Sequence, residues 1–272
     1  MDTITKEKFF SDLQHYHILS PQQQKNASRL IKVSKKFHKN AKLNCEDANI
    51  ESDETIILES GHQPNFLSHA GTWKKAFCLH WIHNNLKCDG NQSVAFFGLA
   101  DQNISTARLL SKNQIPSLNR DGMLKIGFNI KESDKFKSFS SVSKPSLENW
   151  QNEINKINQH YHDIAKKTKM KGLEGNIQWD HVLEILWTSY ETANNFAELN
   201  GYIFAKICYE IFGLDISFFL YSDMHHDNFF MDESVAILRN LHQYNKKYNQ
   251  IVDQKGLHIP RVTLDHMPFW YE

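Results

Sequence analysis

The feature that most constrains the fold of this chain is an apolar run followed by a polar loop, which occurs twice with a helical pattern in between. The first run is 55–58 (TIIL), and the second, 93–100 (SVAFFGLA), is almost continuously apolar, as in a strand buried on both faces. Between them, residues 73–86 carry apolar side chains at close to helical spacing. This order predicts a βαβ unit with a parallel sheet, whose ligands bind beyond the carboxyl ends of the strands.

Other elements follow from local patterns. Asp121-Gly122 between alternating segments predicts a hairpin within 114–130. A third buried strand is expected at 216–221 (ISFFLY). Helices are expected for about twenty residues from 147, in one or two pieces over 178–212, and over 232–254, the last with Asp232 as its N-cap.

Together these elements predict an α/β protein with a Rossmann-like parallel sheet core and an inserted helical segment. We expect a helical lead-in over 1–54, the core over 55–131 and 213–272, and the helical insertion over 132–212. The chain ends on MPFWYE, which is unusually aromatic for a free terminus. Either this end forms a strand of the sheet, or the chain belongs to a longer product.

Composition narrows the classes of function. Lys plus Arg and Asp plus Glu both number 31, so no basic field attracts phosphates, and nucleic acid is not expected as a partner. No apolar run predicts a membrane span and no secretory signal opens the chain, which predicts a cytoplasmic protein. Four scattered cysteines without a CxxC pair indicate neither a disulfide framework nor a zinc site.

The loop after the first strand lies in the stretch 59–77 (ESGHQPNFLSHAGTWKKAF) and concentrates polar residues. A strand-to-helix loop presents free N–H groups and the positive end of the helix dipole, which stabilise a phosphate or carboxylate. Gly61 and Gly71 permit close approach of the backbone to a ligand, and Lys74 or Lys75 can reach back toward an anion. No recognised phosphate-loop pattern occurs here.

Four polar side chains of this loop are candidates for contact with a ligand. The side-chain amides of Gln63 and Asn65 can form hydrogen bonds with amide or hydroxyl groups of a ligand. His62 or His69 can transfer a proton or bind an oxyanion near neutral pH. The alternative is structural: Pro64 and its neighbours build a rigid turn, and the histidines cap backbone groups. Spacing alone leaves both alternatives open.

Polar residues also follow the other two strands. Asp101 closes the second strand and Asp223 follows the third, so we expect both at the ligand-binding edge of the sheet. The cluster 223–227 (DMHHD) could ligate a metal, but adjacent histidines in an extended segment point to opposite faces, and a chain with 15 histidines produces such clusters by chance. We therefore predict a polar edge loop here and no metal site.

The segment 63–67 (QPNFL), followed by Gly71 and Lys75, resembles the QPN[YF]LP opening of the WbqC-like family. That family is associated with attaching amino-acid-type groups to sugars in surface glycans. Ser68 stands where the family usually has proline.

A longer resemblance is to the bacillithiol cysteine-adding enzymes (BshC), which are associated with joining cysteine to an amino sugar carrying malate. The layout is similar: a helical lead-in, a strand, a GQQ loop, a helix, and a strand ending in an acidic segment, then helical and hairpin insertions. Here 61–63 (GHQ) resembles the GQQ loop, Asp101 matches the acidic segment, and 261–272 (RVTLDHMPFWYE) resembles a strand reading roughly NLFYLE. The fold of that family is a Rossmann-like core with inserted helices.

Both resemblances imply a C–N bond-forming ligase or acyltransferase that joins an amino-acid-type acyl group to an amino sugar or similar amine. They imply an activated carboxyl group, and hence ATP or another nucleotide as cofactor and a small molecule as partner. His62, Gln63 and Asp101 are the catalytic candidates. The alternatives are a non-catalytic nucleotide- or small-molecule-binding module derived from such an enzyme, and a metal-dependent hydrolase at 223–227. The residues expected to bind the nucleotide are Gly61, Asn65, His69, Gly71, Lys75 and Asp223.

Overall fold

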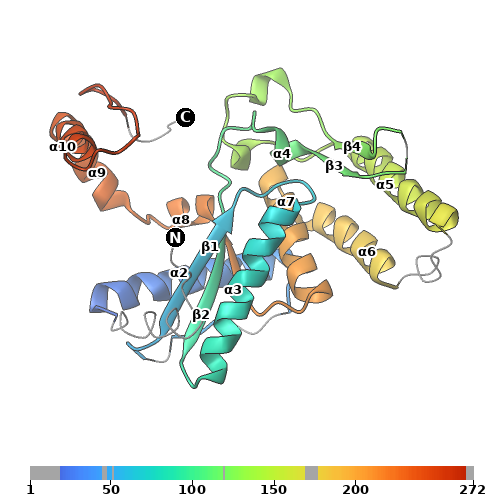
Figure 1. Ribbon diagram of the computed structural model, residues 1–272, viewed down its shortest axis with the longest axis horizontal. Helices are drawn as coiled ribbons and strands as arrows, with labels where there is room; N and C mark the ends of the chain where they lie inside the picture. Colours follow the sequence, from blue (N-terminus) through green and yellow to red (C-terminus); the bar gives the residue numbers. More distant parts are fainter. Residues whose placement is uncertain (1–18, 45–47, 51, 119, 169–176, 268–272) are drawn as a thin grey trace. The chain divides into compact units, whose positions relative to one another are not determined.

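The computed structural model in Figure 1 describes residues 19–44, 48–50, 52–118, 120–168 and 177–267. Contacts between residues divide the chain into two compact units, Met1–Asp223 and Met224–Glu272. The first unit contains both sheets and the helices around them, and the described part of the second contains helices.

The first unit is built on a three-stranded parallel sheet. Its strands are β1 (Ile56–His62), β2 (Ser93–Leu99) and β5 (Ser217–Leu220), in the order β1-β2-β5 with both neighbouring pairs parallel. All of the central strand β2 is buried, as its continuous apolar sequence predicts. The predicted βαβ unit is therefore confirmed, and the protein belongs to the mixed α/β class.

A second sheet is a small antiparallel hairpin. It consists of β3 (Lys112–Pro116) and β4 (Met123–Gly127), and it follows the short helix α4 (Arg108–Ser111). Gly122 in the turn has a φ of 68°, a left-handed conformation that favours glycine. The hairpin prediction is confirmed.

Helices precede, connect and follow the strands of the first unit. α2 (Pro21–Ala41) begins with a capping box, in which Ser20 Oγ accepts the Gln23 N–H at 3.3 Å and Gln23 Oε1 accepts the Ser20 N–H at 2.8 Å. α3 (Ala70–Cys88) is the crossover between β1 and β2. The segment after the hairpin comprises the 3₁₀ turns Glu132–Asp134 and Phe139–Ser141, then α5 (Leu147–Thr168), α6 (Ile177–Thr192), α7 (Phe196–Lys206) and a π-helical turn (Ile207–Ile211).

Helix α7 connects this helical segment to the sheet through one hydrophobic core. Gly201 permits a close approach, since a Cβ there would lie 3.0 Å from the Leu99 side chain and 3.6 Å from that of Leu220. Phe204 of the same helix packs against Phe97 of β2, with ring centroids 5.1 Å apart. The segment expected as an insertion therefore shares its core with the sheet inside one compact unit.

Helix α2 covers the outer edge of β5. His38 Nε2 accepts a hydrogen bond from the Phe218 N–H at 3.0 Å, and the neighbouring Phe37 ring lies 6.5 Å from the Phe218 ring between centroids. His38 is only 4% exposed, so this backbone donor of an edge strand is satisfied inside the protein.

Phe66 anchors the loop between β1 and α3. Its ring is fully buried beside Phe128 and Trp150, with centroids 5.1 and 6.1 Å away. The Phe66 carbonyl accepts a hydrogen bond from Asn113 Nδ2 at 3.1 Å. The core beneath this loop therefore fixes its shape.

Three helices follow the sheet, and they differ from the sequence prediction. They are α8 (Tyr221–His226), which reaches from the first unit into the second, α9 (Met231–Arg239) and α10 (Leu241–Gln254). The polar cluster expected in a loop therefore begins inside α8. The single helix expected over 232–254 is wrong, because the chain leaves helical geometry at Asn240, and the N-cap is Phe230 rather than Asp232.

The described residues after α10 contain no strand up to Met267, and the rest of the expected final strand, 268–272, lies outside the described residues. Side chains of α10 hold this segment instead. Asn245 Nδ2 donates to the carbonyls of Leu264 at 3.0 Å and His266 at 2.8 Å. These hydrogen bonds from the Asn245 side chain satisfy two backbone carbonyls that, in a strand, would accept from a neighbouring strand.

In the part of the chain that the structure describes, no helix combines the length and the apolar content that crossing a membrane requires.

Replacing Phe66 by Ala is expected to lower the free energy of unfolding by about 3–5 kcal/mol, because the change removes a fully buried ring and leaves a cavity. The matched control is Phe136→Ala, since Phe136 is 84% exposed and should change stability by no more than about 0.5 kcal/mol. Urea denaturation of the two variants measures the difference. Equal losses would show that Phe66 does not anchor the loop.

Candidate functional site

The carboxyl edge of the sheet brings together the ends of β1 and β2. Gly61 pairs with Gly98 and His62 with Leu99, and the Ala100 N–H donates to the His62 carbonyl at 2.9 Å. β1 therefore continues to His62, beyond the apolar run 55–58. The pairing of β1 with β2 requires glycine at position 61, because a Cβ there would lie 2.6 Å from the Gly98 carbonyl oxygen, which is too close for van der Waals contact.

His62 is partly buried at the end of β1, and two groups lie within hydrogen-bond distance of its Nδ1. The Gln63 carbonyl oxygen, which can only accept, is 3.2 Å away, and Asn65 Nδ2, which can only donate, is 3.4 Å away. The shorter contact favours the tautomer with the proton on Nδ1 and a bare lone pair on Nε2. Burial lowers the pKa of His62 below its ordinary value of 6.5, opposed by the Gln63 carbonyl and reinforced by Lys75 and His69. His62 is therefore a neutral base near pH 7.

His69 has the complementary tautomer. It is the N-cap of α3, and its Nδ1 accepts the Gly71 N–H at 3.0 Å, so the proton of the neutral ring is on Nε2. The rings of His62 and His69 meet edge to face with centroids 5.3 Å apart. The two neighbouring rings therefore carry a bare nitrogen and an N–H donor, the two kinds of group that acid–base catalysis uses. We call these two residues the histidine pair.

Lys75 and two amide side chains lie in the same segment. Lys75 Nζ donates to the Gly61 carbonyl at 3.1 Å, a neutral partner that leaves its charge available to an anion. Gln63 is partly buried, and its amide forms no hydrogen bond with the described residues. Asn65 is 2% exposed, and its Oδ1 has no hydrogen-bond partner within the described ranges. Because an unpaired buried acceptor is costly, Asn65 is a candidate for binding a donor at this loop.

The first N–H groups of α3 are largely used within the helix start. The Gly71 N–H donates to His69 Nδ1, and the N–H groups of Thr72 and Trp73 donate to the His69 carbonyl at 3.0 and 3.3 Å. The phosphate cradle expected from these backbone donors is therefore not formed by these three residues.

Asp101 lies at the same edge of the sheet, but its carboxylate faces β5 rather than β1. Its Oδ1 accepts the Ser222 N–H at 2.9 Å, and its Oδ2 accepts the Ser222 hydroxyl at 2.5 Å. The side chain is fully buried, and burial raises the pKa of Asp101 to about 6, against the lowering effect of the bonds from Ser222. Asp101 therefore ties the end of β2 to the chain that follows β5.

Asp223 belongs to this second group. It forms an ion pair with Lys36 of α2 at 2.7 Å. Its charge raises the pKa of Asp101, and it also raises the pKa of Tyr202 on α7, where burial and Glu198 have the larger effects. The sequence predicts the aspartates and the β1 loop in one site; in the structure the side chains of Asp101 and Asp223 bond to Ser222 and Lys36, and those of His62 and His69 to groups of the β1 loop and the start of α3. No spacing in the sequence links Lys36 or Tyr202 to the aspartates.

A cross-link between β1 and the end of β5 was not anticipated. The Tyr221 hydroxyl donates to Glu59 Oε1 at 2.8 Å, across the central strand. Gly98 makes room for it, because a Cβ there would lie 2.6 Å from the Tyr221 ring. A glycine inside a buried apolar strand is the signal that could have indicated such a close approach.

Among the described residues, no group of three or more His, Cys, Asp or Glu side chains is arranged to hold a metal ion. In the 223–227 cluster, His225, His226 and Asp227 are exposed, while Asp223 pairs with Lys36.

No model of a protein family and no curated protein matches this chain. The resemblances to the WbqC-like family and to the bacillithiol cysteine-adding enzymes therefore rest on the motifs alone and stay predictions.

The raised pKa of Asp101 predicts a pH dependence of stability. The protonated carboxyl is favoured in the folded state, so its stabilising contribution is complete below the ordinary pKa of 3.8 and is lost as the pH rises through about 6. Asp101→Asn stays neutral, and its stability relative to wild type should improve by up to about 3 kcal/mol between pH 4 and pH 7.

Thermal or urea denaturation at the two pH values measures this change. The control is Asp121→Asn, on the exposed hairpin turn, which should show no comparable gain. Parallel stability curves for wild type and Asp101→Asn would contradict the burial of a titrating carboxyl at this position.

Proposed function

We propose that this protein is an acyltransferase or ligase that joins an amino-acid-type acyl group to an amino sugar or similar amine at the histidine pair. The proposal is supported by the contacts of His62 and His69, which favour a bare Nε2 on the first ring and an Nε2–H on the neighbouring one. Acyl transfer to an amine needs both groups, because the amine loses a proton while the carbonyl oxygen gains negative charge.

In the proposed reaction, the amine nitrogen attacks the carbonyl carbon of an activated acyl donor and forms the C–N bond. His62 Nε2 takes the proton that the amine releases, and the His69 Nε2–H donates to the developing oxyanion. The bond to the leaving group then breaks, and His62 returns the proton to that group. Gln63 orients the donor through its unpaired amide, and Lys75 binds an anionic part of it.

The position of the histidine pair agrees with the usual location of ligands in parallel α/β sheets, beyond the carboxyl ends of the strands. We interpret the β1-β2-β5 sheet with its crossover helix α3 as a Rossmann-like core. The motif resemblances support the same class of reaction.

Nucleotide binding is a separate part of the proposal. Of the residues expected to bind ATP, Lys75 supplies a cation, the Gly71 N–H is already bound by His69, and Asn65 is buried. These groups fit one carboxylate or one phosphate better than a triphosphate. The mechanism therefore starts from an activated acyl donor and assigns no step to ATP.

Asp101 favours a second candidate function, a binding module without catalysis. The acidic segment of the bacillithiol cysteine-adding enzymes is matched here by Asp101 alone, since Gln102 and Asn103 follow it, and the Asp101 carboxylate is buried and bound by Ser222. A chain that had lost catalysis would keep the β1 loop and its ligand.

The test incubates the full chain with glucosamine and one of two donor mixtures, acetyl-coenzyme A or ATP with the common amino acids, and detects amide products by mass spectrometry. His62→Gln should lower kcat/KM by about 10²–10⁴-fold, because it removes the base. The rate of wild type should fall on the acid side of the profile with an apparent pKa below 6.5, since protonated His62 cannot act as a base.

The control variant is His162→Gln, because His162 is exposed on α5 and should leave the rate unchanged. An amide formed at the wild-type rate by both His62→Gln and His69→Gln would overturn the proposed mechanism. Saturable binding of ATP or glucosamine by calorimetry without any product would instead support the binding module.

A further inference from the structure

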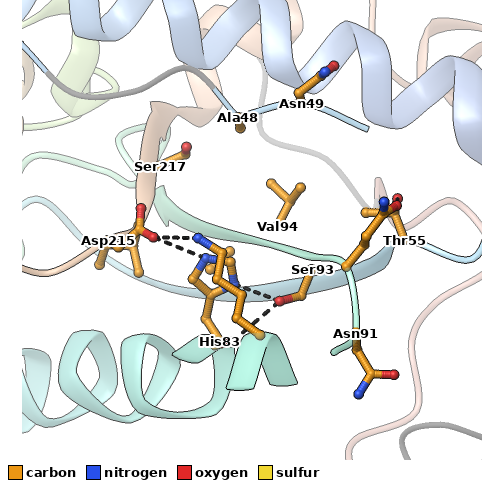
Figure 2. A pocket seen from close by; sticks show the side chains of 13 residues that line it. Ala48, Asn49, Thr55, His83, Asn91, Ser93, Val94, Asp215 and Ser217 are labelled. Atoms are coloured by element: carbon orange, nitrogen blue, oxygen red, sulfur yellow. Dashed lines mark hydrogen bonds and ion pairs between the residues drawn. The ribbon is translucent and has the colours of Figure 1, made fainter. Parts of the chain in front are cut away.

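A cavity of about 320 Å³ lies at the opposite, amino-terminal end of the sheet (Figure 2). It is lined by Ser93, which begins β2, and by Ser217, which begins β5. His83 from α3 and Asp215 from the segment before β5 complete its polar side. None of the residues assigned to the histidine pair belongs to this cavity.

Three of the lining side chains interact in series. Ser93 Oγ lies 2.8 Å from His83 Nδ1, and Asp215 Oδ2 lies 3.5 Å from His83 Nε2. Figure 2 shows Asp215, His83 and Ser93 in one row, with these interactions as dashed lines. His83 is 4% exposed and Ser93 8% exposed, so water has little access to compete for the bond between them.

The protonation of His83 follows from its two partners. A carboxylate can only accept a hydrogen bond, so the Nε2 that faces Asp215 carries the proton of the neutral ring. Nδ1 is then bare and accepts the hydroxyl proton of Ser93. Ser93 Oγ also lies 3.5 Å from the His83 carbonyl oxygen, but the shorter distance to Nδ1 marks the ring as the main acceptor.

Asp215 is held in its ionised form. Lys87 Nζ lies 2.7 Å from its Oδ2. The bond from His83 lowers the pKa of Asp215 most, Lys87 lowers it further, and burial opposes both. A lasting negative charge next to Nε2 stabilises the imidazolium that forms when His83 takes a second proton.

We propose that Ser93 is the nucleophile of a second acyl-transfer site, with His83 as its general base and Asp215 as the group that orients His83, and that its substrates are short-chain carboxylic esters. The contacts run from serine to histidine to aspartate, the order by which such triads are recognised. In the usual serine triad the serine faces Nε2 and the aspartate faces Nδ1, whereas here Ser93 faces Nδ1 of His83 and Asp215 faces Nε2. This site is independent of the histidine pair.

The chemical step balances as an ordinary ester hydrolysis. Ser93 Oγ attacks the ester carbon, His83 Nδ1 takes the hydroxyl proton, and the C–O bond to the alcohol breaks as His83 gives that proton to the leaving oxygen. Water then attacks the acyl group on Ser93, and His83 takes a proton from the water and returns it to Ser93 Oγ. The products are the alcohol and the carboxylic acid.

The size and lining of the cavity set the class of ester. A volume of about 320 Å³ is at the small end of ligand sites, which suits a short acyl chain rather than a lipid. Val94, Ala95 and Ile216 provide apolar surface for the acyl group. Asn91 and Gln92, the two residues before Ser93, also line the cavity; Asn91 Nδ2 donates to the Leu86 carbonyl at 3.4 Å, and Gln92 Oε1 accepts from the Ser52 hydroxyl at 3.0 Å.

The test treats the folded full chain with a small alkyl fluorophosphonate, which transfers its phosphonyl group to an activated serine with release of fluoride. Intact mass and peptide mapping should find one adduct, on Ser93, and p-nitrophenyl acetate should be hydrolysed. Ser93→Ala should abolish both, and His83→Gln should slow labelling by at least about 100-fold. Asp215→Asn, whose side chain is 59% exposed, should slow it by at least about tenfold without unfolding the chain.

The matched control is Ser189→Ala, because Ser189 is also buried, and in the described chain its hydroxyl has no hydrogen-bond partner. Ser93 should react with the fluorophosphonate in Ser189→Ala as fast as in wild type. The same is expected of His62→Gln, and this result would show that the Ser93 site acts independently of the histidine pair. Circular dichroism confirms that each variant is folded. No adduct on folded wild type, an adduct on another serine, or labelling that Asp215→Asn leaves unchanged would overturn the proposal.

Discussion

The pairing of β2 with β1 on one side and β5 on the other is the interaction on which the rest of the structure depends. Its register places Gly61 opposite Gly98 and Gly98 opposite Phe219, which lets Tyr221 cross the central strand to Glu59. If the register of a strand shifted by one residue, every side chain of that strand would move to the other face of the sheet, and no glycine would then lie beneath the Tyr221 ring. Both proposed sites use this register, since one lies at the carboxyl end of β1 and the other at the start of β2.

Much of the fold could be predicted because its central elements carry local signals. The continuous apolar run of β2 and the helical spacing of apolar residues in α3 predict the parallel βαβ unit, and Asp121-Gly122 predicts the hairpin; the structure contains both. The final segment could not be predicted in the same way. Its aromatic and β-branched residues favour a strand, but in the described residues the side chain of Asn245 binds its carbonyls, and a contact across twenty or so residues leaves no periodic pattern.

For the candidate sites, the sequence indicates which residues have useful chemistry but not which way they face. The sequence predicts His62 and His69 after a strand, but only the contacts in the structure, with the Gln63 carbonyl, Asn65 Nδ2 and the Gly71 N–H, bear on their tautomers. Asp101 was expected at the ligand-binding edge of the sheet, and only the structure shows that its carboxylate bonds to Ser222, which follows β5. The Ser93–His83–Asp215 series joins three segments whose spacing in the sequence carries no signal.

The bond from Phe218 to His38 has a consequence for the behaviour of this protein in solution. An open strand edge is a template on which another molecule can add its own strand, and this is a common route to aggregation. With 31 basic and 31 acidic residues, copies of this chain have little net charge to repel one another. By occupying the N–H of Phe218 with a buried imidazole, α2 removes a docking point for intermolecular β-sheet growth at the β5 side without placing a charge in the interior.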